Sequence, residues 1–180
     1  MRPRALIAAA LVAAAAVAVL AWPSGTHRSP PGGSGFAAVV VRPVDGDTLV
    51  ARAGGRTFYV RLLGIDTPET HRPGTPVECG GPEASKAMDA LAPPGARIRL
   101  ESDPTQDRVD RYGRMLAYVW LADGRLLETA QLESGWATTY VYAGHPVSLF
   151  PRLAAAARQA RVTRRGVWSA CGGDFHSAAG

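Results

Sequence analysis

The fold is decided by residues 36–65, which read FAAVVVRPVDGDTLVARAGGRTFYVRLLGI. Apolar and β-branched side chains fill three short runs, and the pairs Asp45-Gly46 and Gly54-Gly55 separate these runs with tight-turn residues. The expected strands are residues 36–41, 48–53 and 57–65. This pattern predicts three consecutive strands joined by tight turns, which is a meander.

The rest of the chain adds further strands and several helices to this meander. Pro82 opens a helical pattern, Gly135 ends a second one, and an amphipathic pattern with an arginine-rich outer face begins near Leu149. The expected helices are residues 82–91, 126–134 and a stretch from about 149 to 160, and the expected extended segments are 97–101, 115–121 and 138–142. Five strands with late helices predict a mainly β fold with helices, in which a closed five-stranded barrel is flanked by about three α-helices.

The N-terminal segment differs from the rest of the chain. Arg2 and Arg4 precede an apolar run, so residues 1–21 are predicted to be a secretory signal peptide. An uncleaved signal anchor is the alternative, because about 17 apolar residues can nearly span a bilayer. Residues 22–35 are rich in Pro, Gly and Ser, which is typical of a flexible linker. We expect one exported domain over residues 36–171, followed by a short tail, residues 172–180.

Charge and cysteine content add two weaker indications. The formal net charge of the whole chain is +5, and it falls to +3 without Arg2 and Arg4, because residues 1–21 contain no acidic residue. A modest positive charge suits a polyanionic partner, but it also suits many surfaces that bind nothing. Cys79 and Cys171 are the two cysteines. In an oxidising compartment they predict one disulfide, with two free thiols as the alternative.

Three polar clusters stand where strands meet turns. They read DGDT at residues 45–48, RLLGIDTPET at 61–70 and DRYGR at 110–114. Alone, each has a structural explanation as a turn, a helix cap or a group of solvated loop charges. Together they supply what phosphodiester hydrolysis needs: carboxylates for a hard divalent cation, a carboxylate that takes a proton from water, and arginines for the phosphoryl oxygens.

These clusters, with GPEAS at residues 81–85, resemble in order and spacing the motifs of the staphylococcal-type thermonuclease family. The resemblance runs from about Val40 to Trp168, which is nearly the whole expected domain. It implies an OB-fold, cleavage of both DNA and RNA, and the use of one calcium ion. Cys79 and Cys171 are not part of the best-known form of that family, and they resemble an added clasp between the loop before residue 81 and the end of the chain.

The resemblance also implies roles for particular residues. Glu69 is expected to be the general base, and Arg61 and Arg114 are expected to hold the phosphate and stabilise the transition state. The implied calcium ligands are the carboxylates of Asp47 and Asp66 and the backbone carbonyl of Thr67. Asp45 matches a position near the metal, without direct ligation.

Three tyrosines match family positions that line the nucleotide pocket. They are Tyr112, Tyr140 and Tyr142. A tyrosine there can stack on a base or bond a phosphate. Their structural alternative is packing against the barrel wall.

The resulting expectation is a secreted, calcium-dependent nuclease that cuts DNA and RNA to products ending in 3′-phosphate. Unpaired or fraying strands are the expected substrates, and the expected state is a monomer without a stable protein partner. Attachment to the outer face of the membrane would require retention of residues 1–21. One alternative is a non-catalytic OB-fold module that binds nucleic acid, but such a module is expected to lack at least one of Arg61, Glu69 and Arg114. The other is a calcium-stabilised structural domain, which leaves the two arginines without a purpose.

Overall fold

The structure is a computed structural model that describes residues 35–70 and 74–179. The expected signal peptide or anchor, residues 1–21, and the linker up to residue 34 lie outside the described residues. In the described part of the chain, no helix combines the length and the apolar character that crossing a bilayer requires.

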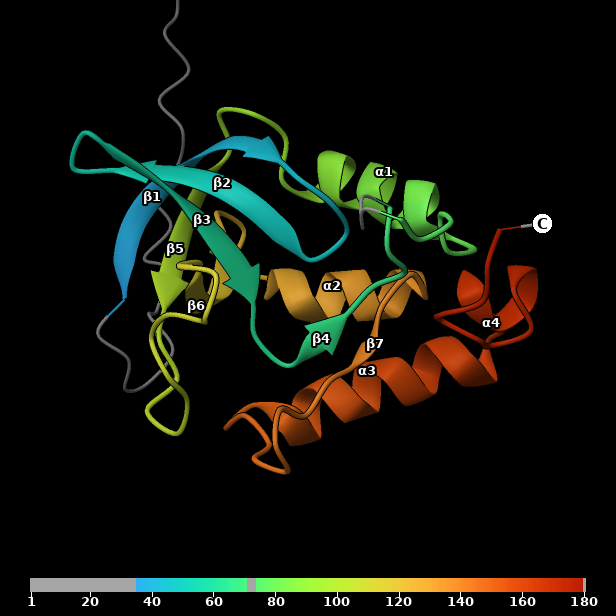
Figure 1. Ribbon diagram of the computed structural model, residues 1–180. Coiled ribbons are helices and arrows are strands. Elements are labelled where there is room, and N and C mark those ends of the chain that lie inside the picture. The colour runs from blue at the N-terminus through green and yellow to red at the C-terminus, as the bar shows by residue number, and fades with distance from the viewer. Residues whose placement is uncertain (1–34, 71–73, 180) are drawn as a thin grey trace, which may run out of the picture.

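Five strands close into a barrel in the order β1–β2–β3–β6–β5, with β5 pairing back onto β1 (Figure 1). These strands are β1 Phe36–Pro43, β2 Thr48–Ala53, β3 Arg56–Leu62, β5 Arg97–Glu101 and β6 Met115–Leu121. The β3–β6 pair is parallel, and the other four pairs are antiparallel. The five-stranded barrel and its starting meander are therefore confirmed.

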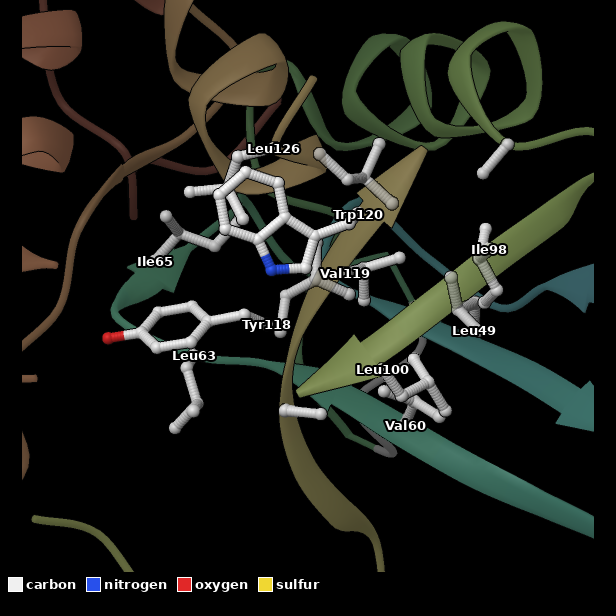
Figure 2. Packing of buried hydrophobic residues seen from close by; sticks show 14 of the residues in the cluster. Leu49, Val60, Leu63, Ile65, Ile98, Leu100, Tyr118, Val119, Trp120 and Leu126 are labelled. Carbon is white, nitrogen blue, oxygen red and sulfur yellow. The ribbon is translucent and has the colours of Figure 1, made fainter. Parts of the chain in front are cut away.

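Apolar side chains from all five strands fill the barrel. Leu49, Val60, Leu100 and Val119 come from four different strands, and each is at most 1% exposed. Figure 2 shows them grouped between the strands. Burying a side chain of this size contributes roughly 1.5–3 kcal/mol. This rigid wall holds the ends of the strands, where the polar clusters lie.

The third strand ends earlier than the sequence predicts. Residues 57–65 were expected to form one strand, but Gly64 has a φ of 74°, which divides β3 from the short strand β4, Ile65–Asp66. A Cβ atom at Gly64 would lie 2.7 Å from side-chain atoms of Val147 and Leu153. The bend turns Asp66 away from the barrel wall, and β4 pairs with β7, Thr138–Thr139.

The helices gather to one side of the barrel (Figure 1). They are α1 Gly81–Leu91, α2 Leu127–Ser134, α3 Phe150–Val162 and α4 Val167–Ala170. The first three are confirmed, each starting within one residue of its predicted first residue. The single turn α4 was not predicted, because four residues are too few to show a helical period.

A disulfide joins Cys79 to Cys171, so the free-thiol alternative is excluded. It links the segment before α1 to the end of α4. The residues beyond Cys171, which we expected to be a tail, continue along the domain. Phe175 is buried against the Trp168 ring, and Ala178 forms an antiparallel bridge with Glu78.

Candidate active site

Arg61 links two of the predicted metal ligands. Its Nη2 atom lies 3.0 Å from Oδ2 of Asp47 and 2.8 Å from Oδ1 of Asp66. Its Nη1 atom donates to the carbonyl oxygens of Leu62 and Ile65 at 2.9 and 2.8 Å. The guanidinium is thereby fixed where β3 bends into β4, and it faces two carboxylates from separate segments of the chain.

Asp47 lies at the entrance to β2 and is almost fully buried. Its Oδ1 accepts a hydrogen bond from the Thr48 hydroxyl at 3.0 Å, and its Oδ2 accepts two from Thr67 at 3.2 Å, one from the backbone and one from the hydroxyl. An ordinary hairpin turn would leave its aspartate in solvent. The turn explanation for this cluster therefore fails, because the Asp47 carboxylate points inward and joins residues twenty positions apart.

Negative charge accumulates beside Arg61. Burial and the charge of Asp47 raise the pKa of Asp45 to about 7, despite hydrogen bonds from backbone N–H groups and the nearby Arg61. Burial and Asp47 also raise the pKa of Asp66, while Arg61 and then His176 oppose the rise. The positive charge of Arg61 thus acts on three neighbouring carboxylates, those of Asp45, Asp47 and Asp66. Raised carboxylate pKa values of this kind are typical of a site that favours a cation.

Arg114 approaches the same place from the loop before β6. Its Nε donates to Oδ2 of Asp110 at 2.7 Å, and the Asp110 carboxylate also accepts backbone N–H groups of Tyr112 and Arg114. Its Nη1 lies 3.4 Å from the Thr48 hydroxyl, which is itself bonded to Asp47. Asp110 therefore orients Arg114 toward Asp47. The Thr48 hydroxyl lies between the Arg114 guanidinium and the Asp47 carboxylate.

Glu69 follows three residues after Asp66, beyond the end of β4. Its Oε1 accepts the backbone N–H of Thr70 at 3.0 Å. Its own backbone is held by Glu78, whose Oε2 accepts the Glu69 N–H at 2.7 Å and whose N–H donates to the Glu69 carbonyl at 2.9 Å. The structure thus brings Arg61 into direct contact with both Asp47 and Asp66, and it ties the Glu69 backbone to Glu78.

An open cleft of about 540 Å³ lies against this group. Arg61, Asp66, Arg114 and the three predicted tyrosines are among its lining residues. Tyr112 is 68% exposed, and Arg111 and Arg114 lie over its ring at 4.8 and 5.4 Å. Tyr140 and Tyr142 are also exposed, so packing inside the barrel wall does not account for these rings. An aromatic surface beside two guanidinium groups suits a base next to its phosphate.

The donor set fits a hard divalent cation. Asp47 and Asp66 offer carboxylate oxygens, and the raised pKa values around them indicate negative charge that Arg61 alone does not balance. Among the residues that the structure describes, no group of three or more His, Cys, Asp or Glu side chains is arranged to hold a metal ion. A cation bound by two carboxylates would complete its shell with backbone oxygen and water.

The closed barrel with its flanking helices is an OB-fold of the nuclease type. The family described as "Staphylococcal nuclease homologue" matches residues 59–170. The thermonuclease of Staphylococcus hyicus is 37% identical over 130 residues, which cover 72% of this chain and 74% of that protein. The micrococcal nuclease of Shigella flexneri is 32% identical over 173 residues, covering 92% of this chain and 87% of the relative.

A second thermonuclease, from Staphylococcus intermedius, is 46% identical over 85 residues, or 47% of this chain and 49% of that protein. The chain therefore belongs to the staphylococcal nuclease family. It is a nuclease, a hydrolase that acts on phosphodiester bonds, and the resemblance in its motifs is confirmed.

Sequence reasoning missed several residues that support the site. Gln131 is fully buried in α2, and its side-chain amide donates to the carbonyls of Gly46 and Ala84 at 2.8 and 2.9 Å. This contact fixes the turn that presents Asp47. A polar residue on the apolar face of a predicted helix is a signal that could have identified Gln131. Glu78, which accepts the Glu69 N–H, and His176, which contacts Glu78, had no comparable signal.

Proposed function

We propose that this nuclease is secreted and cleaves both DNA and RNA in a calcium-dependent reaction, leaving 3′-phosphate and 5′-hydroxyl ends. One observation carries the proposal: Arg61 bonds both Asp47 and Asp66 beside a cleft that Arg114 also lines. Arg61, Arg114 and Asp66 line this cleft, and Asp47 pairs with Arg61. Two guanidinium groups and two carboxylates in this arrangement match the charge pattern of a phosphodiester with a divalent cation.

In this proposal the carboxylates bind the metal ion and the arginines bind the phosphate. Asp47 and Asp66, with the Thr67 carbonyl, would hold the calcium ion. When bound, calcium neutralises charge on the non-bridging phosphate oxygens. Arg61 and Arg114 donate hydrogen bonds to the phosphoryl oxygens and stabilise the charge that grows as water adds to phosphorus.

Glu69 is the proposed general base. Its carboxylate takes a proton from the attacking water, and the water oxygen bonds to phosphorus. The bond to the 5′ oxygen breaks, and this oxygen leaves with the bonding electron pair and takes a proton from solvent water to become the 5′-hydroxyl. Because water is the nucleophile, the 2′-hydroxyl of ribose is not needed, so DNA and RNA are both substrates. The exposed tyrosines Tyr112, Tyr140 and Tyr142 offer stacking surfaces that favour unpaired or fraying strands.

The test uses the purified exported chain with denatured DNA and with RNA, in calcium or in excess chelator. Removing a charged transition-state group is expected to lower kcat by about 10²–10³-fold or more, so Glu69→Gln and Arg114→Ala should be nearly inactive. Glu83→Gln and Arg125→Ala are matched controls, because both side chains are exposed and lie outside the cleft lining. Polynucleotide kinase should label the 5′ ends of the products directly.

Activity that persists in chelator, or full activity in both active-site variants, would contradict the mechanism. Secretion is tested separately by mass spectrometry of the protein recovered from the medium. The signal-peptide hypothesis predicts a mature chain that begins near Trp22, whereas an anchor predicts an intact N-terminus in the membrane fraction.

A further inference from the structure

The C-terminal segment places an imidazole beside the active-site carboxylates. The Nδ1 atom of His176 lies 3.3 Å from Oε2 of Glu78, and its Nε2 atom lies 3.8 Å from Oδ2 of Asp66. The Glu78 oxygen is the same atom that accepts the Glu69 backbone N–H. One ring therefore contacts a predicted metal ligand and the side chain that holds the predicted base.

Glu78, like Asp47, is a carboxylate that is only 6% exposed and accepts a hydrogen bond from the backbone. Its Oε2 takes the Glu69 N–H at 2.7 Å, and its own N–H returns a bond to the Glu69 carbonyl. A charge-assisted bond of this length is stronger than an ordinary backbone hydrogen bond. The position of the Glu69 backbone is thus set by a buried carboxylate nine residues further along the chain.

Backbone hydrogen bonds and the disulfide hold the chain before and after His176 against residues 77–79. Cys79, the neighbour of Glu78, donates its N–H to the Ser177 carbonyl at 2.8 Å and is bonded through sulfur to Cys171. Ala179 donates its N–H to the Val77 carbonyl at 2.8 Å. These contacts align the segment antiparallel to residues 77–79.

The side chains on this segment give it a fixed path. Phe175 is buried, with its ring 5.1 Å from that of Trp168. The Asp174 side chain accepts a hydrogen bond from the backbone N–H of His176 at 2.9 Å. The His176 side chain remains 60% exposed, so it does not serve as a packing residue of the core. Buried anchors thus present an accessible imidazole to two carboxylates.

We propose that Glu78 and His176 are positioning residues for the nuclease reaction: Glu78 fixes the backbone of Glu69, His176 fixes Glu78, and the disulfide-tied C-terminal segment thereby completes the active site. The inference rests on the role proposed for Glu69. A positioning role follows because the placement of a catalytic group by a fraction of an ångström changes the rate, and because hydrogen-bonded partners behind such groups orient them.

The experiment uses the full exported chain and compares His176→Ala, His176→Asn and Ser177→Ala. Asparagine places an amide N–H near the position of Nδ1, so it keeps the donor to Glu78. Ser177 is the matched control, because it is the next residue, and its hydroxyl bonds only locally, to the Asp174 carbonyl. We expect His176→Ala to lower kcat by about tenfold with little change in KM, and we expect asparagine to restore most of the loss.

A second measurement does not depend on activity. In the metal-free protein, hydrogen exchange of the Glu69 amide should become about tenfold faster in Glu78→Ala and clearly faster in His176→Ala, but not in Ser177→Ala. Thermal unfolding of each variant is recorded in parallel. A change in the Glu69 amide and in kcat, at an unchanged unfolding temperature, supports a positioning role rather than general stabilisation.

Several results would overturn the inference. If wild-type protein is an active nuclease and His176→Ala has the same kcat, His176 has no positioning role. The same conclusion holds if Ser177→Ala lowers kcat as much as His176→Ala, or if asparagine restores nothing. Failure of the proposed function looks different, because wild-type protein would then show no calcium-dependent cleavage while the Glu69 amide would still respond to Glu78→Ala.

Discussion

Asp103, in the loop after β5, and the aspartates beside Arg61 are both withdrawn from water, but their surroundings differ. Asp103 accepts hydrogen bonds from the Tyr118 hydroxyl at 2.6 Å and from the backbone and hydroxyl groups of Thr105 and Ser148, all within 2.8 Å. Burial raises the pKa of Asp103, yet these donors outweigh it and hold the pKa at about 2. Its charge is satisfied by the protein alone.

The carboxylates at the cleft have fewer donors and more negative neighbours. Burial and Asp47 raise the pKa of Asp45 to about 7, and the same two causes raise that of Asp66. Asp103 is thus fully hydrogen-bonded within the protein, whereas Asp45 and Asp66 have fewer protein donors and a like-charged neighbour. Between these residues, the direction of the pKa shift separates Asp103, which is fully hydrogen-bonded by the protein, from Asp45 and Asp66 beside Arg61.

Arg61→Gln should produce the largest effect in this comparison. The variant loses the proposed phosphate donor and removes the guanidinium that pairs with both Asp47 and Asp66. We expect kcat/KM to fall by about 10³-fold, or about 4 kcal/mol of transition-state stabilisation. Steady-state cleavage of denatured DNA measures it. Arg125→Ala, which removes an exposed arginine paired with Asp123, is the control. A loss below tenfold would show that Arg61 is mainly structural.

Sequence patterns predicted the secondary structure and the motif residues of the site, but they missed features that depend on distant parts of the chain. The strands, the three longer helices and the OB-fold follow from local periodicity and from motifs that lie close together in the chain. Asp47, Asp66 and Arg61 were grouped through family motifs, and the structure shows them in contact. The break at Gly64 was missed because its cause, the approach of Val147 and Leu153, lies more than eighty residues away.

The Asp103 network was also invisible in the sequence. Its donors, Thr105, Tyr118 and Ser148, come from separate segments, and none belongs to a motif. The contact of His176 with Glu78 was missed for the same reason, since 98 residues separate the two. Long-range hydrogen bonds between common polar residues leave no periodic signal, whereas repeated apolar positions do.

Asp103→Asn should destabilise the fold strongly while leaving the reaction nearly intact. An amide cannot accept all five hydrogen bonds, because its NH₂ group would face either the Tyr118 hydroxyl and the Ser148 N–H or the Thr105 N–H and the hydroxyls of Thr105 and Ser148. We expect a loss of about 3 kcal/mol in the free energy of unfolding. Urea denaturation measures this, with the exposed Asp123→Asn as control. A change in kcat greater than a few-fold would contradict the structural assignment of Asp103.

The pH dependence of stability gives a further test of Asp103. Its pKa is about 2 in the folded protein and 3.8 ordinarily, so folding favours the carboxylate form. This stabilisation is complete above about pH 4 and is lost as the pH falls through 3.8 toward 2. It amounts to about 2 kcal/mol. The stability difference between wild-type protein and Asp103→Asn should therefore shrink by that amount between pH 5 and pH 2. A constant difference would refute the lowered pKa.

Asp47→Asn should have the smallest effect on stability, although it removes a buried charge. In chelator, the variant loses one partner of Arg61, but Arg61 keeps Asp66, and the repulsion of Asp45 and Asp66 is relieved. The asparagine oxygen can still accept from Thr67. These changes oppose each other, so we expect the free energy of unfolding to change by less than about 1 kcal/mol.

The measurement is urea denaturation of Asp47→Asn beside Asp103→Asn, both in chelator at neutral pH. The two substitutions replace the same group at two buried sites, so their difference isolates the surroundings. If Asp47→Asn also lost about 3 kcal/mol, its carboxylate would be a structural group like that of Asp103. A near-neutral result, together with lost cleavage activity in calcium, would mean that the carboxylate is kept for a ligand rather than for the fold.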